Sequence, residues 1–487
     1  MNYLNYAGEA FLLIPLSAIF LNNICNKRFI EKHFHILTGA VALLQMIAAV
    51  FAFYIMDANQ MLNFDFSVFG SSKITGIELF DINPVSLVFL FCIGMVAFVS
   101  VMISIRTIDV KKGSYVNLLM TLLIGMNGMV MVSDLFSLYV FLDVIGISSF
   151  VMIAMFRSRK GLEGSIKYLI ISEIASIFIL MGLSFISMKT GSLSFKDIGR
   201  NLLTNTFELQ TILIYAAIIL MIAGFSIKAG IVPFHSWLPD AHQSADTSIS
   251  VLLSGIVIKI AGIYGIYVLT NIFGGIKAYQ VSLAGLGIIS VVVGALLAAC
   301  QSHFKRIVAY SSVSQMGYIL LGLSTGSTLG IVGAVAHVFS HAAFKSTLFT
   351  NAAAIHEQTG TLEIDEMGGL QSRMPVTAFS STIAFLSTAG IPPFAGFWSK
   401  LLIVMALWGS GNQILAGFAL CASILTSAYF LRLQKKVFFG KTPEHLSSVT
   451  EVTGSIKFAE ILLTAVTCIV GVLFPLIIIF LHSRGLI

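Results

Sequence analysis

The sequence predicts an all-α membrane protein with about 14 transmembrane helices. Of its 487 residues, 57% are hydrophobic and only 10% are charged, whereas about 25% of the residues in soluble domains are charged. The mean hydropathy is +0.95, and the apolar runs reach about 20 residues, the length of a helix that crosses a lipid bilayer. Because the runs are uniformly apolar and do not alternate, they exclude the strands of a membrane barrel.

We expect one polytopic membrane domain over residues 1–487, with no separate catalytic domain. Helices 1–3 lie within 1–110, helices 4–8 form a first repeat in 111–275, helices 9–13 form a second repeat in 276–435, and helix 14 lies in 436–487. The apolar runs that predict the spans lie near residues 4–22, 34–56, 84–106, 114–132, 134–156, 164–187, 210–234, 247–272, 279–300, 306–325, 329–354, 376–408, 412–433 and 459–481.

The basic residues gather in five loop clusters that all fall on the same side of the membrane. By the positive-inside rule this side is cytoplasmic, so we expect both termini on the non-cytoplasmic side of a prokaryotic cytoplasmic membrane. The net charge of +6 follows from these loops and does not indicate nucleic-acid binding. The clusters consist of Lys27, Arg28 and Lys32; Arg106, Lys111 and Lys112; Arg157, Arg159 and Lys160; Lys305 and Arg306; and Arg432, Lys435, Lys436 and Lys441.

Two predicted spans are interrupted by proline shortly before or after a lysine. Pro233 follows Lys228 in the seventh span, and Pro392 and Pro393 precede Lys400 in the twelfth. Proline removes a helical hydrogen-bond donor and clashes with the preceding turn, so both spans should be broken helices. Paired breaks about five spans apart are typical of transporters with inverted repeats, which predicts two inverted five-helix repeats here.

The spans also contain ionisable side chains, each of which costs at least about 3 kcal/mol in the middle of a bilayer. We expect these residues to face a hydrated interior and to transfer protons. His337, His341 and Lys345 recur every four residues, which places them on one helical face with about 6 Å between successive residues. Asp143 is the expected acidic partner of Lys228, and it would favour the charged lysine. The predicted proton-transfer residues are Asp143, Lys228, Lys259, His337, His341, Lys345 and Lys400.

Three further residues are weaker candidates, and each has a structural alternative. Lys167 lies near the start of its span, from which a lysine can extend to the interface. Glu173 has the alternative of a hydrogen bond to a neighbouring helix, as His337 has that of a packed, hydrogen-bonded histidine. His235 lies in a loop with Asp240 and His242, but their spacing is not that of metal ligands.

We expect no cofactor, no metal and no redox site in this chain. Its five cysteines, Cys25, Cys92, Cys300, Cys421 and Cys468, are scattered without a C-x-x-C pair, which argues against an iron–sulfur cluster, a zinc site or a disulfide framework. No flavin, haem or nicotinamide motif is visible in the sequence either.

Four stretches, in this order, resemble the antiporter-like subunits of respiratory complex I, whose relatives occur in Mrp antiporters and membrane-bound group 4 hydrogenases. They are AGIVPFHSWLPDAH, KRIVAYSSVSQMGY, FSHAAFKSTLF and GIPPFAGFWSK. The resemblance covers roughly residues 80–435. It implies 14 helices with broken helices 7 and 12, and proton translocation along a hydrated axis in the middle of the membrane.

The resemblance also implies a role for individual residues. Asp143 corresponds to the acid of helix 5, Lys228 to the lysine of broken helix 7 and Lys259 to the connecting residue of helix 8. His341 and Lys345 correspond to the relay of helix 11, and Lys400 corresponds to the exit residue of helix 12. This chain departs from the family pattern at Asp143, where glutamate is usual, and at His303, where aspartate is common. Glu173 has no counterpart in the pattern.

The sequence therefore predicts a proton-translocating subunit of a redox-driven complex, either an energy-converting hydrogenase or a complex I-like assembly. The subunit would have no catalytic redox site of its own. Its expected partners are other membrane subunits, including further antiporter-like subunits, a peripheral redox arm and the lipid bilayer. Two alternatives remain open at this point: a D-type component of an Mrp-type Na+/H+ antiporter, and a structural membrane subunit that does not transport ions.

Overall fold

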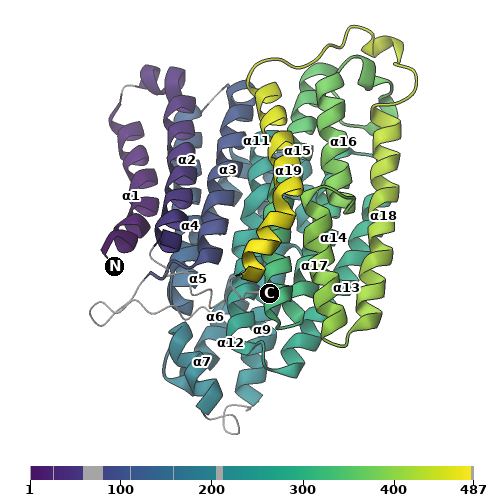
Figure 1. The fold of residues 1–487 in the computed structure, drawn as a ribbon. Coiled ribbons are helices and arrows are strands. Elements are labelled where there is room, and N and C mark those ends of the chain that lie inside the picture. Colours follow the sequence, from purple (N-terminus) through teal and green to yellow (C-terminus); the bar gives the residue numbers. More distant parts are fainter. Residues whose placement is uncertain are drawn as a thin grey trace. The chain divides into compact units, whose positions relative to one another are not determined.

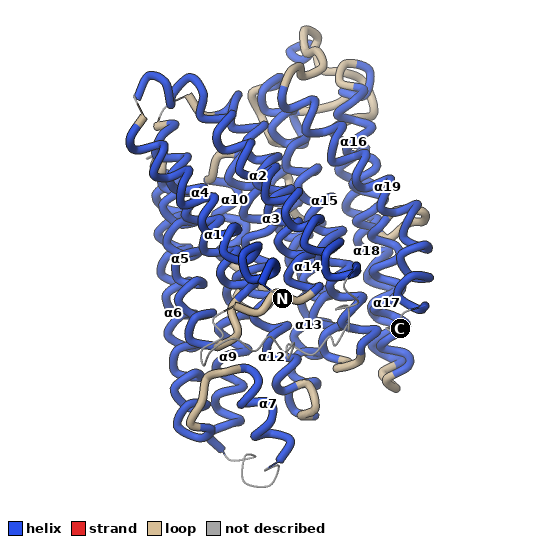
Figure 2. The backbone as a smooth tube through the Cα atoms, turned by 60° about the vertical axis from the view of Figure 1, so that its left-hand side comes forward, coloured by secondary structure: helices blue, strands red, loops and turns tan. Residues whose placement is uncertain are grey.

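The computed structural model describes residues 2–25, 27–58, 80–109, 111–156, 158–204 and 212–483, and these residues are almost entirely helical (Figures 1 and 2). Pairing between extended segments in this described part is limited to three isolated bridges. The prediction of an all-α protein is confirmed.

Within the described residues, 11 helices are long and apolar enough to cross a membrane. The other predicted spans are the first helix, whose apolar part is Gly8–Ile24, the polar helix α15 (Thr328–Thr359), and the short helices α16 (Pro375–Ala389) and α17 (Ala395–Gly409) of the interrupted span. Polar residues lower the mean hydropathy of α15, and the break shortens α16 and α17.

The chain folds into two compact units. The first unit comprises Met1–Phe98, Val110–Gly230 and Val257–Val281. Its helices are α1 (Asn2–Ile24), α2 (Lys27–Ala58), most of α3 (Pro84–Thr107), α4 (Lys112–Met131), α5 (Leu135–Ala154), α6 (Arg159–Thr190), α7 (Phe195–Thr204), α9 (Ile212–Ala229), the π-helix η2 (Lys259–Tyr264) and α12 (Gly265–Phe273).

The second unit comprises Val99–Asp109, Ile231–Ile256 and Ser282–Ile487. Besides α15, α16 and α17, it contains α10 (Trp237–Ser244), α11 (Thr247–Leu252), most of the π-helix η1 (Leu253–Val257), most of α13 (Lys277–Ala299), α14 (Phe304–Ser324), α18 (Gln413–Val437) and α19 (Ser455–Ser483). Three short 3-10 turns, η3 (Ile364–Glu366), η4 (Leu370–Ser372) and η5 (Glu444–Leu446), lie in its loops.

Side-chain caps and proline define several helix starts. The Asp134 carboxylate accepts the Ser137 N–H at 2.8 Å before α5, and the Ser158 hydroxyl accepts the Gly161 N–H at 3.0 Å before α6. Each oxygen satisfies a backbone donor that the helix leaves without a partner. Pro375 occupies the first turn of α16, where a missing N–H costs nothing.

Both predicted helix breaks are present. Helix α9 ends at Ala229, Gly230 follows with φ of 66°, and the next helix starts only at Trp237. Helix α16 ends at Ala389, Gly390 follows with φ of 81°, and α17 starts at Ala395. Glycine adopts this left-handed conformation without the steric cost of a side chain, and the prolines that follow prevent the helix from resuming at once.

A feature that the sequence does not reveal is the π-helical backbone of residues 253–257 and 259–264. The second of these π-helices, η2, begins at Lys259 and ends at Tyr264. Gly262 lies so close to α9 that an added Cβ would be 2.5 Å from the Ala229 nitrogen. The wider π-helical turn and this close backbone contact together position Lys259, in agreement with the frequent occurrence of π-helical turns at functional sites.

We predict that Gly294→Ala destabilises the second unit by about 1–3 kcal/mol, because an added Cβ on α13 would lie 2.5 Å from the Ser314 nitrogen of α14. The matched control is Gly285→Ala on the same helix, where a Cβ meets no atom within 4 Å; better helix propensity should leave its stability unchanged or slightly higher. Thermal unfolding in detergent measures both variants. Equal melting temperatures for the two variants would contradict the packing that we describe.

Candidate functional site

Lys228 is a buried lysine of the first unit. It lies in the last turn of α9, its side chain is 4% exposed, and its Nζ donates a hydrogen bond of 2.7 Å to the hydroxyl of Ser172 on α6. Gly146 of α5 leaves room for this contact, because an added Cβ would lie 3.3 Å from the Lys228 Nζ. Helices α5, α6 and α9 therefore form the pocket that holds the ammonium group.

Asp143 lies on α5 and binds a second hydroxyl of α6. The Ser176 Oγ donates to the Asp143 carboxylate at 2.6 Å, one helical turn from the Ser172 that holds Lys228. The ion pairs within the described residues do not include one between Asp143 and Lys228. Two serines of α6 thus hold the acid and the base separately, in keeping with the shorter reach of aspartate compared with glutamate.

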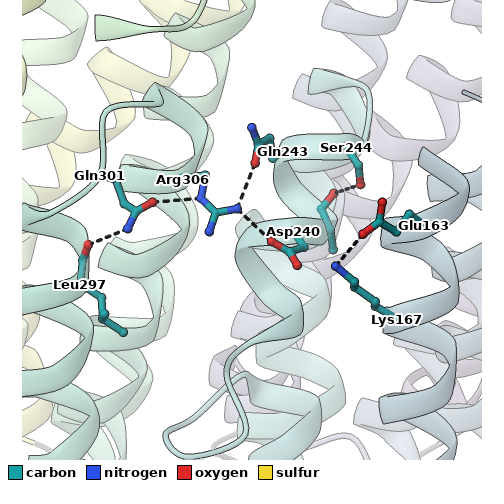
Figure 3. A network of polar contacts seen from close by, with 9 residues as sticks. Glu163, Lys167, Asp240, Gln243, Ser244, Leu297, Gln301 and Arg306 are labelled. Carbon is teal, nitrogen blue, oxygen red and sulfur yellow. Dashed lines mark hydrogen bonds and ion pairs between the residues drawn. The ribbon is translucent and has the colours of Figure 1, made fainter. Parts of the chain in front are cut away.

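The weaker candidates on α6 lie at its surface. Lys167 is exposed and pairs with Glu163 at 2.8 Å, one turn earlier on the same helix (Figure 3). Glu173 is also exposed, although it directly follows Ser172 in the middle of this long apolar helix. Lys167 therefore forms an exposed ion pair near the start of α6. Glu173, in contrast, places a carboxyl group on an exposed apolar face of the same helix.

Lys259 is completely buried at the first residue of η2. Cys92 of α3 is among its electrostatic neighbours within the first unit. Because an ammonium group has a strong preference for water or hydrogen-bond acceptors, its burial in an apolar helix is a costly feature that packing alone does not explain.

In the second unit, α15 carries the predicted file of titratable residues. His337, His341 and Lys345 are all fully buried, and the rings of the two histidines lie 6.4 Å apart, close to the spacing that the sequence predicts. His337 Nδ1 lies 2.9 Å from the Ser399 hydroxyl, and its Nε2 lies 3.2 Å from the Gln315 side-chain oxygen. The imidazole is therefore both packed and hydrogen-bonded at each nitrogen.

Two buried lysines of the second unit, Lys345 and Lys400, donate hydrogen bonds to backbone carbonyl groups. The Lys345 Nζ donates to the Val308 carbonyl at 2.9 Å and also to the hydroxyl of Ser311. The Lys400 Nζ donates to the Thr388 carbonyl at 2.8 Å and lies 4.4 Å above the ring of Tyr318. Thr388 belongs to the last turn of α16, where the helix leaves carbonyl groups without helical partners. The break thus supplies the acceptor that holds Lys400.

His235 lies in the segment that links α9 to α10. It is partly exposed and packs against Tyr310, with 6.1 Å between the ring centroids. Asp240, which the sequence groups with it, pairs with Arg306 at 2.9 Å (Figure 3). His242 stacks on Phe349 with 4.9 Å between centroids.

The family is identified by residues 132–426, which match the model described as "NADH:quinone oxidoreductase/Mrp antiporter, TM". This segment is more than half of the chain and contains all of the predicted proton-transfer residues. The chain belongs to the NADH:quinone oxidoreductase/Mrp antiporter family. It is an antiporter-like integral membrane protein.

Individual relatives come from different assemblies. The chain is 32% identical over 337 residues to NADH-quinone oxidoreductase subunit N of Desulforudis audaxviator (strain MP104C), covering 69% of this chain and 66%, just under two thirds, of that relative. It is 33% identical to the D-type subunit of the Na(+)/H(+) antiporter of Alkalihalophilus pseudofirmus, covering 72% of this chain and 71% of the relative.

A solved structure also has the same fold over nearly the whole chain. A chain of the membrane-bound sulfane sulfur reductase, an archaeal respiratory membrane complex, superposes with a TM-score of 0.85 at 28% identity. The match covers 98% of this chain and 96% of that one. The agreement supports the antiporter-like membrane fold.

The residues that sequence reasoning missed are the uncharged partners of the predicted proton-transfer residues. Ser172, Ser176, Gln315, Ser399 and Ser311 all hold a titratable side chain. Their signal in the sequence is a small polar residue inside an apolar span, but many such residues instead bond to their own helix, as Ser184 does.

We predict that Ser172→Ala destabilises the protein by about 1–3 kcal/mol, because it removes the hydroxyl that accepts from the buried Lys228 ammonium. Thermal unfolding in detergent or lipid nanodiscs measures the loss. The control is Ser184→Ala on the same helix, where the exposed hydroxyl bonds to the Leu180 carbonyl and stability should change by a few tenths of a kcal/mol. A larger loss for Ser184→Ala than for Ser172→Ala would refute the assignment.

Proposed function

We propose that this chain is a proton-translocating subunit of a multisubunit, redox-driven membrane complex. The observation that carries the proposal is the burial of the four lysines that lie inside predicted spans, Lys228, Lys259, Lys345 and Lys400, each at most 5% exposed. A lysine buried in this way can change its protonation state, because desolvation disfavours its ammonium form. The Nζ atoms of Lys228, Lys345 and Lys400 each donate a hydrogen bond to an oxygen atom, which stabilises the protonated form.

Each unit offers its own proton-binding groups. In the first unit, a proton that arrives at the Lys228 Nζ is stabilised by Ser172, and Asp143 contributes a nearby negative charge. In the second unit, His337 and His341 carry imidazole groups, which can bind and release a proton, and they lie between Lys345 on the same helix and Lys400 beyond the break. We propose that Asp143, Lys228, Lys259, His337, His341, Lys345 and Lys400 transfer protons, and that Lys167 and His235 do not.

The names of the relatives support a multisubunit complex. One relative is a subunit of an NADH-quinone oxidoreductase and one matching structure belongs to a respiratory membrane complex. We infer that this chain associates with further antiporter-like subunits and with a peripheral redox arm that performs the electron transfer. We place the complex in a prokaryotic cytoplasmic membrane, with both termini on the non-cytoplasmic side.

A second candidate function is Na+/H+ antiport without a redox partner. The 33% identity to the D-type subunit of an Na(+)/H(+) antiporter favours it. Purification of the native complex and identification of its subunits by mass spectrometry separates the two functions. Co-purifying redox subunits support the first function, whereas a complex composed only of membrane subunits supports the second.

The proposed role of the lysines predicts that Lys228→Ala and Lys400→Ala each slow proton pumping by roughly tenfold or more, since each removes a proton-binding group. The reconstituted complex is assayed in vesicles that contain a pH-sensitive dye. Lys277→Ala is the control, because Lys277 is an exposed lysine at the start of α13. If both buried-lysine variants pump at the parental rate, the chain is a structural subunit.

The exposed Glu173 supports a contact with a partner subunit. It lies among the exposed apolar side chains Ile170, Ile174 and Ile177 of α6, and a carboxylate facing lipid at this position costs about 3 kcal/mol. We propose that a transmembrane helix of another subunit covers this face and donates a hydrogen bond or a positive charge to Glu173.

Glu173→Arg should therefore release the partner subunit, because it replaces the acceptor by a positive charge. Native electrophoresis of the solubilised complex measures the loss. The control Glu163→Arg changes the same helix near its start, where Glu163 is exposed and pairs with Lys167, and it should leave the complex intact. An intact Glu173→Arg complex would show that this face is not the contact surface.

A further inference from the structure

The second unit contains a buried acid that lies outside the row of lysines and histidines. Glu460 is on α19, and its side chain is fully buried. Helix α19 packs against α15 and α16, which also pack against each other (Figure 1). A second acid, Glu451, is partly exposed in the segment that leads into α19. Burial of a carboxyl group in a membrane protein is costly, so its partners indicate what it does.

One hydroxyl group joins the two acids. The Thr377 Oγ1 lies 2.8 Å from the Glu451 Oε1 and 3.1 Å from the Glu460 Oε2. The other oxygens of both acids are also occupied. The Glu451 Oε2 accepts the Val376 N–H at 2.6 Å. With its amide oriented to satisfy its neighbours, the Asn351 side chain donates to the Glu460 Oε1 at 2.8 Å.

The number of hydrogens shows that this group holds a proton. A threonine hydroxyl has one hydrogen, so it can make a full, linear hydrogen bond to only one of the two carboxyl groups. Two ionised carboxylates would therefore leave one of the two contacts to Thr377 without a hydrogen, with two negative charges near each other. Both contacts are full hydrogen bonds if one acid is protonated and donates its O–H to the Thr377 oxygen, while Thr377 donates to the other acid.

The surroundings identify which acid is protonated. Glu451 accepts a backbone N–H at the start of α16, where a carboxylate is stabilised by the helix N-terminus. Glu460 is fully buried and has a single amide donor on its other oxygen. Lys457, also on α19, is the cationic group that acts on Glu460, and Glu451 is the acidic one. The proton therefore belongs on the Glu460 Oε2.

We propose that Glu460, Thr377 and Glu451 form a proton relay between the interior of the second unit and its surface. The Glu460 O–H bond breaks as its proton moves to the Thr377 oxygen, while the original Thr377 hydrogen moves to the Glu451 Oε1. The hydroxyl is restored, Glu460 becomes an anion and Glu451 becomes a neutral acid that exchanges its proton with water. The same steps in reverse carry a proton inward.

The location of the relay indicates which side of the membrane it faces. The helices α16 and α19 both begin here, next to the loop that follows the basic residues Lys435 and Lys436 of α18. The positive-inside rule assigns this end to the cytoplasmic side. Asn351 belongs to α15, the helix that also carries His341 and Lys345. The relay would thus exchange protons between the second unit and the cytoplasm, a role in transport that rests on the proposed function.

Infrared difference spectroscopy of the whole complex tests the stored proton directly. A protonated carboxyl group gives a carbonyl stretch that shifts in D2O and that carboxylates and amides lack. We expect Glu460→Gln to remove one such band, Glu460→Asp to retain it and Glu451→Gln to leave the Glu460 band in place. An unchanged band in Glu460→Gln would overturn the proposal, whatever the complex transports.

Pumping assays test the relay itself with a matched pair at Thr377. Thr377→Val keeps the shape of the side chain but removes the hydroxyl, so pumping should fall roughly tenfold, whereas Thr377→Ser should restore it. Glu460→Gln should lower the pumping rate as much as Thr377→Val does, and it should retain the melting temperature and the subunit composition of the parent complex. If Thr377→Val and Glu460→Gln pump normally while Lys228→Ala does not, the relay is wrong and the proposed function stands. Normal pumping by Lys228→Ala would instead contradict the proposed function, and the infrared band would still test the stored proton.

Discussion

The structure depends on a single constraint: a lysine buried among apolar helices must have an oxygen atom within hydrogen-bond distance. Lys228, Lys345 and Lys400 satisfy it in three different ways. Lys228 uses a serine hydroxyl of a neighbouring helix, Lys345 uses a hydroxyl and a backbone carbonyl, and Lys400 uses a carbonyl at a helix end together with an aromatic face. In each case the acceptor that holds the lysine is an uncharged group.

The helix breaks provide oxygen atoms where an intact helix would not. Proline and a left-handed glycine end α16 at Ala389, which leaves the Thr388 carbonyl for Lys400. At the other break, Gly230 and Pro233 end α9 just beyond Lys228, whose acceptor comes from α6 instead. The two breaks are alike in sequence, but they place their lysines against different types of oxygen.

Glu173 and Glu460 illustrate opposite consequences of the same cost, that of placing a carboxyl group in a membrane. Glu173 is exposed on an apolar face, and a partner subunit would provide what lipid does not. Glu460 is buried, and a proton shared through Thr377 removes the charge. For these two acids, exposure separates a proposed contact surface from a proposed proton site.

The sequence by itself determined the all-helical membrane fold, the two breaks and the lysines and histidines of the interior. Hydropathy, proline and glycine act within one turn or one span, so these features can be recognised locally. Only the tertiary structure decided which oxygen holds each base, that Asp143 and Lys228 bind separate serines, and that Lys259 starts a π-helical turn. The contacts of Lys228 with Ser172 and of Glu460 with Thr377 join residues 56 and 83 positions apart. Such pairs depend on helix packing, which hydropathy does not encode.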